Sequence, residues 1–219
     1  MSAMDSRTFF DIMGTAPATV TVVTTLGPAG DARGLTVGAV TSVSAEPPSL
    51  LISIDHRSRS LPDLVVAGRF AVNYLRGDRA EISRRFSSPS THRFEGIEWR
   101  PGSTGVPILH ADSLSWLECR IEQIVESGDH VVVIAEVEDG APPPPQSRPL
   151  MYFRHHYEAW PGQVEDAAGP DARKEVERTA SPSSAASSVA PASEGLEATA
   201  VTSVSGTSDA RGATATGSQ

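Results

Sequence analysis

The pattern of apolar and β-branched residues predicts that strands dominate the chain up to Trp160. Residues 18–26 are β-branched almost throughout, and the turn residues 27–31 lead into a second such stretch, 33–43, so the two predict a hairpin. The apolar run 49–54 lies between chain breakers, as expected for a strand buried on both faces. The same reasoning predicts further strands at residues 70–75, 114–125, 130–137 and 149–160.

Two short helices are expected between these strands. Ser60, Pro62 and Gly68 stand where the cap, the first turn and the end of one helix would lie, and residues 78–86 predict the other. Many long antiparallel strands with two small helices predict a mainly β fold, a closed or nearly closed barrel. A doubly wound sheet is disfavoured, because no Gly-x-Gly-x-x-Gly follows a strand. The irregular stretch 87–105 is long enough to suggest a functional loop.

The composition changes after Trp160, the last aromatic residue. Residues 162–219 consist largely of Ala, Ser, Thr, Gly, Pro and Glu. Such a segment buries too little apolar surface to offset about 1–2 kcal/mol of backbone entropy per residue. The sequence therefore predicts one domain over residues 1–161 and a disordered tail over residues 162–219.

Charge and cysteine content exclude several classes of function. Lys+Arg 18 against Asp+Glu 27 gives a net charge of −9, which argues against a nucleic-acid partner. The single cysteine, Cys119, excludes an intramolecular disulfide and a multi-cysteine metal site, and its alternating surroundings predict a core residue. The only lysine, Lys174, lies in the predicted tail, so Schiff-base and P-loop chemistry are disfavoured. With no signal peptide or membrane segment apparent, we expect a cytoplasmic protein without a membrane partner.

The histidines suggest no metal site. His155 and His156 are adjacent on a predicted strand, so their side chains would point to opposite faces. His130 differs, because it begins a strand directly after the Gly128-Asp129 turn, at the rim of the predicted barrel. The absence of a Gly-x-Ser-x-Gly elbow makes hydrolysis an unfavoured reading.

The stretch 34–48 combines small side chains with many hydroxyls. Gly38 and Ala39 leave room for a flat group to approach the backbone, and neighbouring threonines and serines offer neutral donors. The stretch 56–60, His-Arg-Ser-Arg-Ser, adds two guanidiniums, two hydroxyls and the start of a helix, which together can hold a phosphate. The alternative is a solvent-facing strand followed by a basic turn.

Eight motifs, taken in order over residues 6–160, resemble the flavin reductase family with the FMN-binding split-barrel fold, the small reductase components of two-component flavin monooxygenases. The motifs that carry the resemblance are residues 19–25 (TVTVVTT), 34–48 (GLTVGAVTSVSAEPP), 54–60 (IDHRSRS), 68–75 (GRFAVNYL), 93–99 (RFEGIEW), 116–119 (WLEC), 128–130 (GDH) and 149–154 (PLMYFR).

The resemblance implies roles for particular residues. His130 would be the catalytic residue, facing the nicotinamide of NADH or NADPH. The remaining residues would bind FMN or FAD: along the ring Thr36, Val37, Gly38, Ala39 and Val40; along the ribityl chain and phosphate Ser42, Val43 and Ser44; at the phosphate end Arg57, Ser58, Arg59 and Ser60; and near the flavin Phe94. The family often has a bulkier polar residue where Gly38 stands, so Gly38 would enlarge the flavin pocket, and the choice between FMN and FAD stays open.

Three hypotheses follow. The first is an NAD(P)H:flavin oxidoreductase of the EC 1.5.1 type, a homodimer that supplies reduced flavin to a separate monooxygenase. The second is a flavin-binding electron carrier or redox sensor that does not turn over NAD(P)H. The third is an interaction module whose tail recruits the oxygenase.

Overall fold

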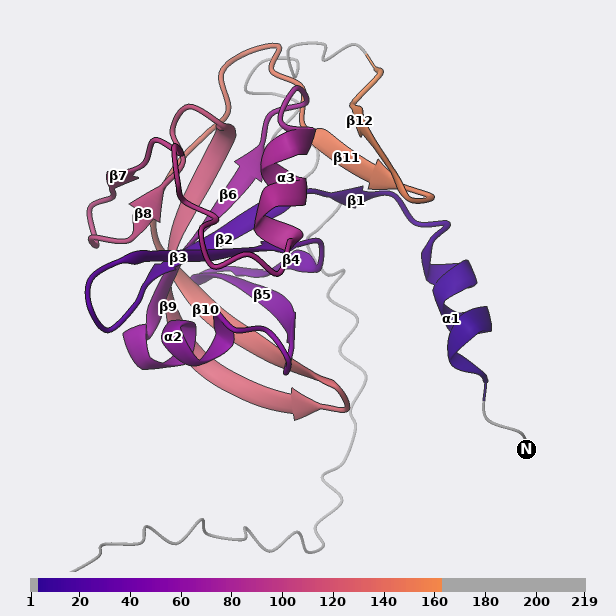
Figure 1. The fold of residues 1–219 in the computed structure, drawn as a ribbon, viewed down its shortest axis with the longest axis horizontal. Coiled ribbons are helices and arrows are strands. Elements are labelled where there is room, and N and C mark those ends of the chain that lie inside the picture. Colours follow the sequence, from indigo (N-terminus) through magenta and orange to yellow (C-terminus); the bar gives the residue numbers. More distant parts are fainter. Residues whose placement is uncertain (1–3, 163–219) are drawn as a thin grey trace, which may run out of the picture. The chain divides into compact units, whose positions relative to one another are not determined.

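The structure is a computed structural model and describes residues 4–162 (Figure 1). The helices are α1 (Ser6–Met13), α2 (Leu61–Ala67) and α3 (Ala80–Ser87). The strands are β1 (Ala18–Thr19), β2 (Thr21–Leu26), β3 (Ala32–Val37), β4 (Val40–Ala45), β5 (Pro48–Asp55), β6 (Arg69–Leu75), β7 (Arg100–Pro101), β8 (Pro107–Ile108), β9 (Ser113–Ser127), β10 (His130–Ala141), β11 (Leu150–Phe153) and β12 (His156–Ala159).

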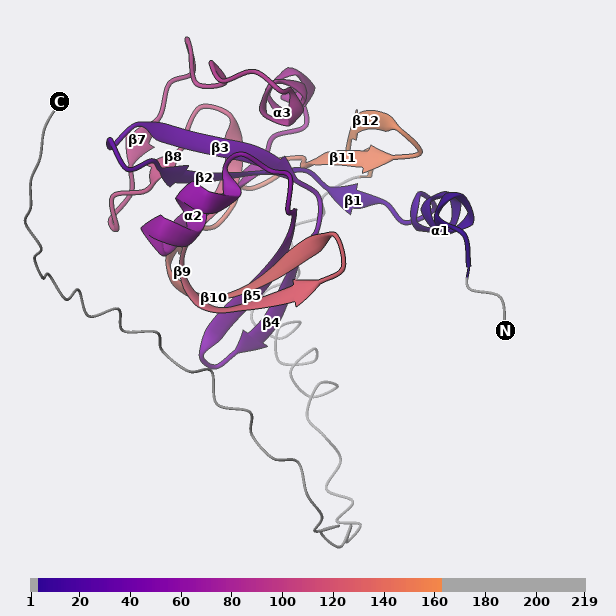
Figure 2. The ribbon, with the colours of Figure 1, turned by 60° about the horizontal axis from the view of Figure 1, so that its bottom comes forward.

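A seven-stranded antiparallel sheet forms the centre of the fold, with the strand order β3-β2-β6-β9-β10-β5-β4. β3 and β4 follow each other in the chain but stand at opposite edges of the sheet. Only Gly38 and Ala39 separate them, and the Ser53 N–H donates to the Ala39 carbonyl at 3.1 Å. The two edges are therefore close together, and the sheet curls into the predicted split barrel (Figure 2).

The predicted hairpin is confirmed in its first half and wrong in its second. β2 pairs with β3 as expected, but β3 ends at Val37, and the chain continues as β4, which pairs with β5 at the other edge of the sheet. Gly38 and Ala39, which are poor strand formers, are the sign of this break in an otherwise β-branched run. It occurs where the chain must cross from one edge of the curled sheet to the other.

The buried faces of the strands form the main core. In β5, Leu50, Ile52 and Ile54 are at most 3% exposed, whereas the residues between them are half-buried. The prediction that this strand is buried on both faces is therefore wrong, because Ser53 and Asp55 face a hollow that we describe below. Cys119 is 1% exposed and belongs to the same core, as predicted.

The strands predicted at 70–75, 114–125 and 130–137 are confirmed as β6, β9 and β10, and the helices as α2 and α3. α2 ends at Gly68, whose φ of +65° is the left-handed conformation that glycine adopts without strain. Ser60 precedes the helix without a side-chain cap bond, because its hydroxyl donates to the Gly34 carbonyl at 3.3 Å. Leu61 and Leu64 of α2 pack into the main core.

The predicted strand 149–160 is two strands. β11 and β12 form a hairpin whose turn consists of Arg154 and His155, both with positive φ. His155 therefore lies in a turn, which corrects the placement of the two histidines on one strand. β1 pairs with β11, so this hairpin and β1 make a separate three-stranded sheet.

α1 was not predicted. Its N-cap is Asp5, which accepts hydrogen bonds from the Thr8 N–H at 3.0 Å and the Thr8 hydroxyl at 2.7 Å. That spacing is the signal in the sequence that could have found it. Except for residue 162, the predicted disordered tail lies outside the described residues.

Candidate functional site

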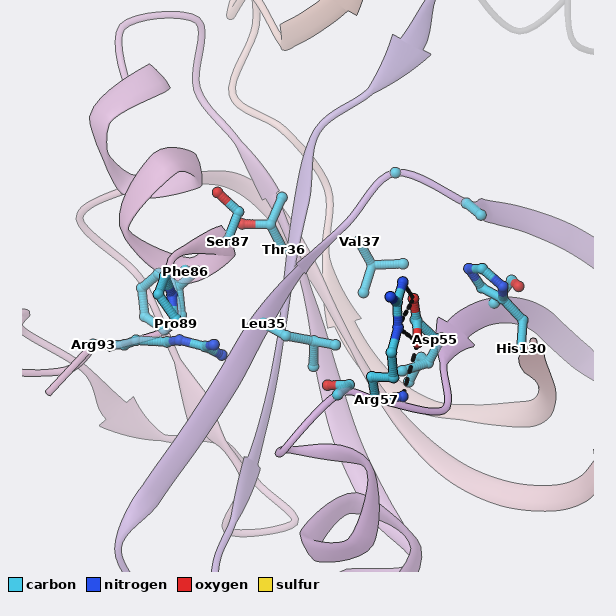
Figure 3. Close-up of a pocket in the computed structure, with 15 residues that line it drawn as sticks. Leu35, Thr36, Val37, Asp55, Arg57, Phe86, Ser87, Pro89, Arg93 and His130 are labelled. Carbon is cyan, nitrogen blue, oxygen red and sulfur yellow. Dashed lines mark hydrogen bonds and ion pairs between the residues drawn. The ribbon is translucent and has the colours of Figure 1, made fainter. Parts of the chain in front are cut away.

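A hollow with a volume of about 760 Å³, the main hollow, opens between the end of β3, the end of β5 and the loop that follows α3 (Figure 3). Its size falls in the range of small-molecule sites, about 300–1,000 Å³. It is lined by Leu35, Thr36, Val37, Gly38, Ala39, Ser53, Ile54, Asp55, Arg57, Ser58, Phe86, Ser87, Pro89, Arg93 and His130.

The backbone of β3 and the link to β4 form the wall of this hollow. Thr36, Val37, Gly38 and Ala39 line it, as the sequence predicted. A Cβ at Gly38 would meet no atom within 4 Å, so the glycine exposes its backbone to open space. The Thr36 hydroxyl donates to the Ser83 carbonyl of α3 at 2.6 Å, so its proton holds the helix against the strand. The wall therefore presents backbone groups and small side chains to a ligand, and the Thr36 hydroxyl is not free to donate to it.

Arg57 lies at the rim and is already paired with an acid. Its guanidinium forms two-point contacts with Asp55, the shortest at 2.6 Å, and its backbone N–H donates to the same carboxylate at 2.8 Å. These hydrogen bonds from Arg57 hold the pKa of Asp55 well below its usual range. The charge of Arg57 is compensated, and Ser58 next to it also lines the hollow.

His130 lies at the end of the hollow opposite Arg93 (Figure 3). It begins β10 directly after the Gly128-Asp129 turn, as predicted, and Gly128 supplies the positive φ of that turn. Its Nδ1 lies 2.7 Å from Oδ1 of Asp129. This contact lowers the pKa of Asp129. Because Nδ1 is occupied by Asp129, Nε2 is the ring nitrogen left to meet a ligand.

Several predicted site residues do not line this hollow. Val40, Ser42, Val43 and Ser44 lie on β4, where every residue after Val40 is exposed. Their assignment to the ribityl chain and phosphate remains a prediction.

Arg59, Ser60 and Phe94 instead line a second, smaller hollow of about 80 Å³. Ser60 is 5% exposed and its hydroxyl is engaged with Gly34, so little of it reaches a ligand. Phe94 packs edge-to-face on Phe86, with 4.9 Å between the ring centres. Phe86 lines the main hollow, so Phe94 supports the wall between the main hollow and the second hollow.

Sequence reasoning missed eight lining residues: Leu35, Ser53, Ile54, Asp55, Phe86, Ser87, Pro89 and Arg93. The first four belong to β3 and β5, and the last four lie at the end of α3 or in the loop that follows it. The length of that loop was a signal of function, and Arg93 stands directly before the predicted Phe94. Only the folded chain shows that this segment closes one end of the hollow.

No cluster of three or more potential metal-ligating side chains occurs in the part of the chain that the structure describes. Within the same residues, no helix is long and apolar enough to cross a membrane.

The fold and the hollow together define a class of protein: a split β-barrel with an open site beside an edge strand, walled by backbone and small side chains and bordered by Arg57 and Arg93. The chain belongs to the flavin reductase like domain family, whose model matches residues 13–161.

Individual relatives and solved structures point to the same family. The chain is similar to "Flavin reductase (NADH)" of Kitasatospora aureofaciens, with 48% identity over 72% of this chain and 83% of that one. It is also similar to the flavin-dependent monooxygenase reductase subunit HsaB of Mycobacterium tuberculosis, with 35% identity over 72% of this chain and 84% of the relative. A "Probable flavin reductase" of Rhizobium meliloti matches at 40% identity over 61% of this chain, which spans only 42% of that relative.

Among solved structures, the Streptomyces globisporus NADH:FAD oxidoreductase SgcE6 in complex with NAD and FAD fragments gives a TM-score of 0.67 at 27% identity, covering 75% of this chain and all (100%) of that one. The residues of the main hollow fit a flavin. The space above Gly38 admits a flat ring against the β3 backbone, and polar side chains stand at both ends.

Proposed function

We propose that this protein is an NAD(P)H:flavin oxidoreductase of the EC 1.5.1 type, which transfers a hydride from NADH or NADPH to FMN or FAD. The observation that carries the proposal is the joint presence, in one hollow, of the open Gly38 backbone and His130. Membership of the family and the relatives named above support it.

The flavin supplies the redox chemistry when bound, since its ring accepts the hydride from the nicotinamide. The chain's own residues bind and orient. The β3 backbone from Thr36 to Ala39 would hold the ring, Ser58 would donate to a phosphate, and His130 would direct Nε2 at the nicotinamide side. No side chain needs to form a covalent bond, because positioning two reactants side by side is the main contribution required.

The test is NADH and NADPH oxidation by the purified protein, followed by nicotinamide absorbance, with FMN, FAD or no flavin added. Turnover that depends on added flavin is expected. His130→Gln should raise the KM for the dinucleotide, whereas the matched variant His110→Gln, at an exposed residue outside both hollows, should not. A protein that binds flavin but oxidises neither dinucleotide would contradict the proposal and favour the electron carrier or sensor.

A homodimer is the second part of the proposal. α1 has no buried residue, and Phe9, Phe10, Ile12 and Met13 are 49% to 67% exposed. A run of exposed apolar side chains on one helix is a common mark of a protein interface, and a second copy of the chain is the partner that we propose.

Light scattering tests the dimer. Phe10→Ser should convert it to a monomer, whereas Val66→Ser, at a residue of α2 that is 76% exposed, should not. A wild-type monomer would refute this part.

A separate monooxygenase that receives the reduced flavin, in the cytoplasm, completes the proposal. The monooxygenase reductase subunit among the relatives supports it. Coupled hydroxylation with a candidate oxygenase tests it. Deletion of residues 163–219, which lie outside the described residues, tests the hypothesis that the tail recruits the oxygenase. If it does, coupled hydroxylation falls while flavin reduction persists. If it does not, neither activity changes.

A further inference from the structure

The end of helix α3 forms part of the wall of the main hollow. Phe86 and Ser87 line the hollow there, at the end away from His130 (Figure 3). Ser83 lies three and four residues before them, so the three side chains share one face of the helix. Whatever holds Ser83 in place therefore also places the two residues that line the hollow.

Ser83 joins α3 to the opposite wall of the hollow, which is β3. Its backbone carbonyl accepts a hydrogen bond from the Thr36 hydroxyl at 2.6 Å, and Thr36 itself lines the hollow. One helical turn later, Phe86 packs so closely on β3 that a Cβ at Gly34 would lie only 2.9 Å from its ring. A shift of α3 would therefore move the wall of the hollow.

The hydroxyl of Ser83 is held by a residue from a distant part of the chain. Ser83 is fully buried, and a buried hydroxyl requires a hydrogen-bond partner. In a helix the local partner is a carbonyl one turn earlier, but Ser83 donates instead to the phenol oxygen of Tyr157, at 3.0 Å. Within residues 4–162, this is the one side-chain hydrogen bond between α3 and the three-stranded sheet of β1, β11 and β12.

Tyr157 is itself well anchored in β12. The guanidinium carbon of Arg84, also in α3, lies 5.0 Å from the centre of its ring, a second contact between this tyrosine and the helix. The ring also packs against the apolar cluster that contains Phe86 and Leu150. Tyr157 can thus serve as a fixed point against which α3 is held.

We propose that Tyr157 and Ser83 are positioning residues for the flavin. Through the carbonyl of Ser83 and the shared face of α3, they set the distance between the end of the helix and the β3 backbone, and with it the width of the hollow that takes the ring. Neither residue lines the hollow, so neither touches the ligand. The identification of the ligand as a flavin rests on the proposed function.

Tyr157→Phe is the main test, because it removes only the phenol oxygen and keeps the ring beside Arg84. The Ser83 hydroxyl then loses its acceptor, and the helix face is released. FMN and FAD binding, measured by flavin fluorescence, should weaken about 3- to 10-fold, as expected for the loss of one hydrogen bond. In turnover, the KM for the flavin should rise in the same proportion, whereas kcat and the KM for NADH should change less than about twofold, because His130 lies at the other end of the hollow.

Two further variants follow the same chain of contacts. Ser83→Ala removes the donor without leaving a buried hydroxyl, should weaken flavin binding in the same direction, and decides the matter if Tyr157→Phe does not fold. Thr36→Val removes the other hydroxyl that meets Ser83, so its effect on flavin affinity should be less than additive with that of Tyr157→Phe, although the two residues share no hydrogen bond. Thr36→Ser keeps the hydroxyl and should retain most of the affinity.

Tyr152→Phe is the matched control. Tyr152 lies opposite Tyr157 in the same hairpin, is 36% exposed and lines neither hollow. Its phenol group meets only the ring of His155, at 3.4 Å, among the described residues. Loss of this hydroxyl should leave flavin affinity and turnover as in the wild type.

The inference is overturned if Tyr157→Phe and Ser83→Ala lower the Tm and leave flavin affinity unchanged, because the two residues then serve stability alone. Additive effects of Tyr157→Phe and Thr36→Val on flavin affinity would overturn it as well. A wild-type protein that binds flavin but oxidises neither dinucleotide rejects the proposed function and leaves this test in force, since binding is measured without turnover. A wild-type protein that binds no flavin overturns both.

Discussion

Glu118 belongs to the motif 116–119, and its carboxylate tests whether this motif serves the stability of the fold or the binding of a ligand. Glu118 is fully buried and lies in β9, away from both hollows. Its Oε1 accepts from the Ser103 N–H at 2.8 Å, and its Oε2 accepts from the Thr104 N–H at 2.7 Å and from the Thr104 hydroxyl. Glu118 thus holds the turn between β7 and β8 against the sheet.

Glu118→Gln keeps the size of the side chain and removes one acceptor. In either orientation of the amide, its NH₂ group faces one of the two backbone N–H groups, which is then left buried without a partner. Such a group costs about 1–3 kcal/mol, and the weakened bonds to the neutral oxygen add to it, so we expect a loss of about 2–4 kcal/mol in the free energy of unfolding. For a domain of this size that corresponds to a Tm lower by about 5–15 °C.

Gly102→Ala tests the same contact from the other side. A Cβ at this position would clash with Oε1 of Glu118, so the carboxylate must move. The cost of Gly102→Ala should be smaller in a Glu118→Ala background, where the clashing oxygen is absent, and the two changes should therefore not be additive.

Urea unfolding measures these free energies, and flavin binding is the second readout. Glu98→Gln is the control, because this glutamate is exposed and its ion pair with Arg100 contributes little. The reasoning is refuted if Glu118→Gln costs no more than the control at an unchanged m-value, or if Gly102→Ala is equally costly in both backgrounds. Flavin affinity should remain that of the wild type in every variant that folds.

Three more outcomes are expected. Gly38→Leu should leave the Tm within about 1 °C, since its Cβ meets open space, yet weaken flavin binding at least about tenfold by filling the hollow; unchanged binding would remove Gly38 from the site. Cys119 should resist thiol reagents until the protein unfolds, because burial raises its pKa to about 12; labelling of the native protein would contradict this. Arg57 lowers the pKa of Asp55, and Arg69 lowers that of Glu138, so the unfolded chain takes up protons first as the pH falls. The urea midpoint of unfolding should therefore decrease as the pH is lowered below about 4.5. A midpoint that increases on acidification would contradict this prediction.

The sequence by itself determined most of the elements and one end of the site. β-branched runs are extended wherever they lie, so β2, β6, β9 and β10 were predictable, and the Gly128-Asp129 turn placed His130 at a strand end. Gly38 and Ala39 were identified from their lack of side chains, which is a local property. Ser60, Pro62 and Gly68 delimit α2 by rules that concern a single turn of chain.

The tertiary structure alone decided how these pieces meet. β3 and β4 were read as one strand in the sequence. Gly38 and Ala39 mark a weak point between them, but only the curling of the sheet sends the two strands to opposite edges. Arg93 joins the site because the loop after α3 packs across β3, and the partners that fix it are carbonyls, which every residue has and no pattern marks. Whether an arginine is free or compensated depends on which carboxylate the fold brings near it: Asp55 reaches Arg57, and no acid of the described residues reaches Arg93. Charge balance at a site is a property of distances in space, and the order of residues along the chain does not contain it.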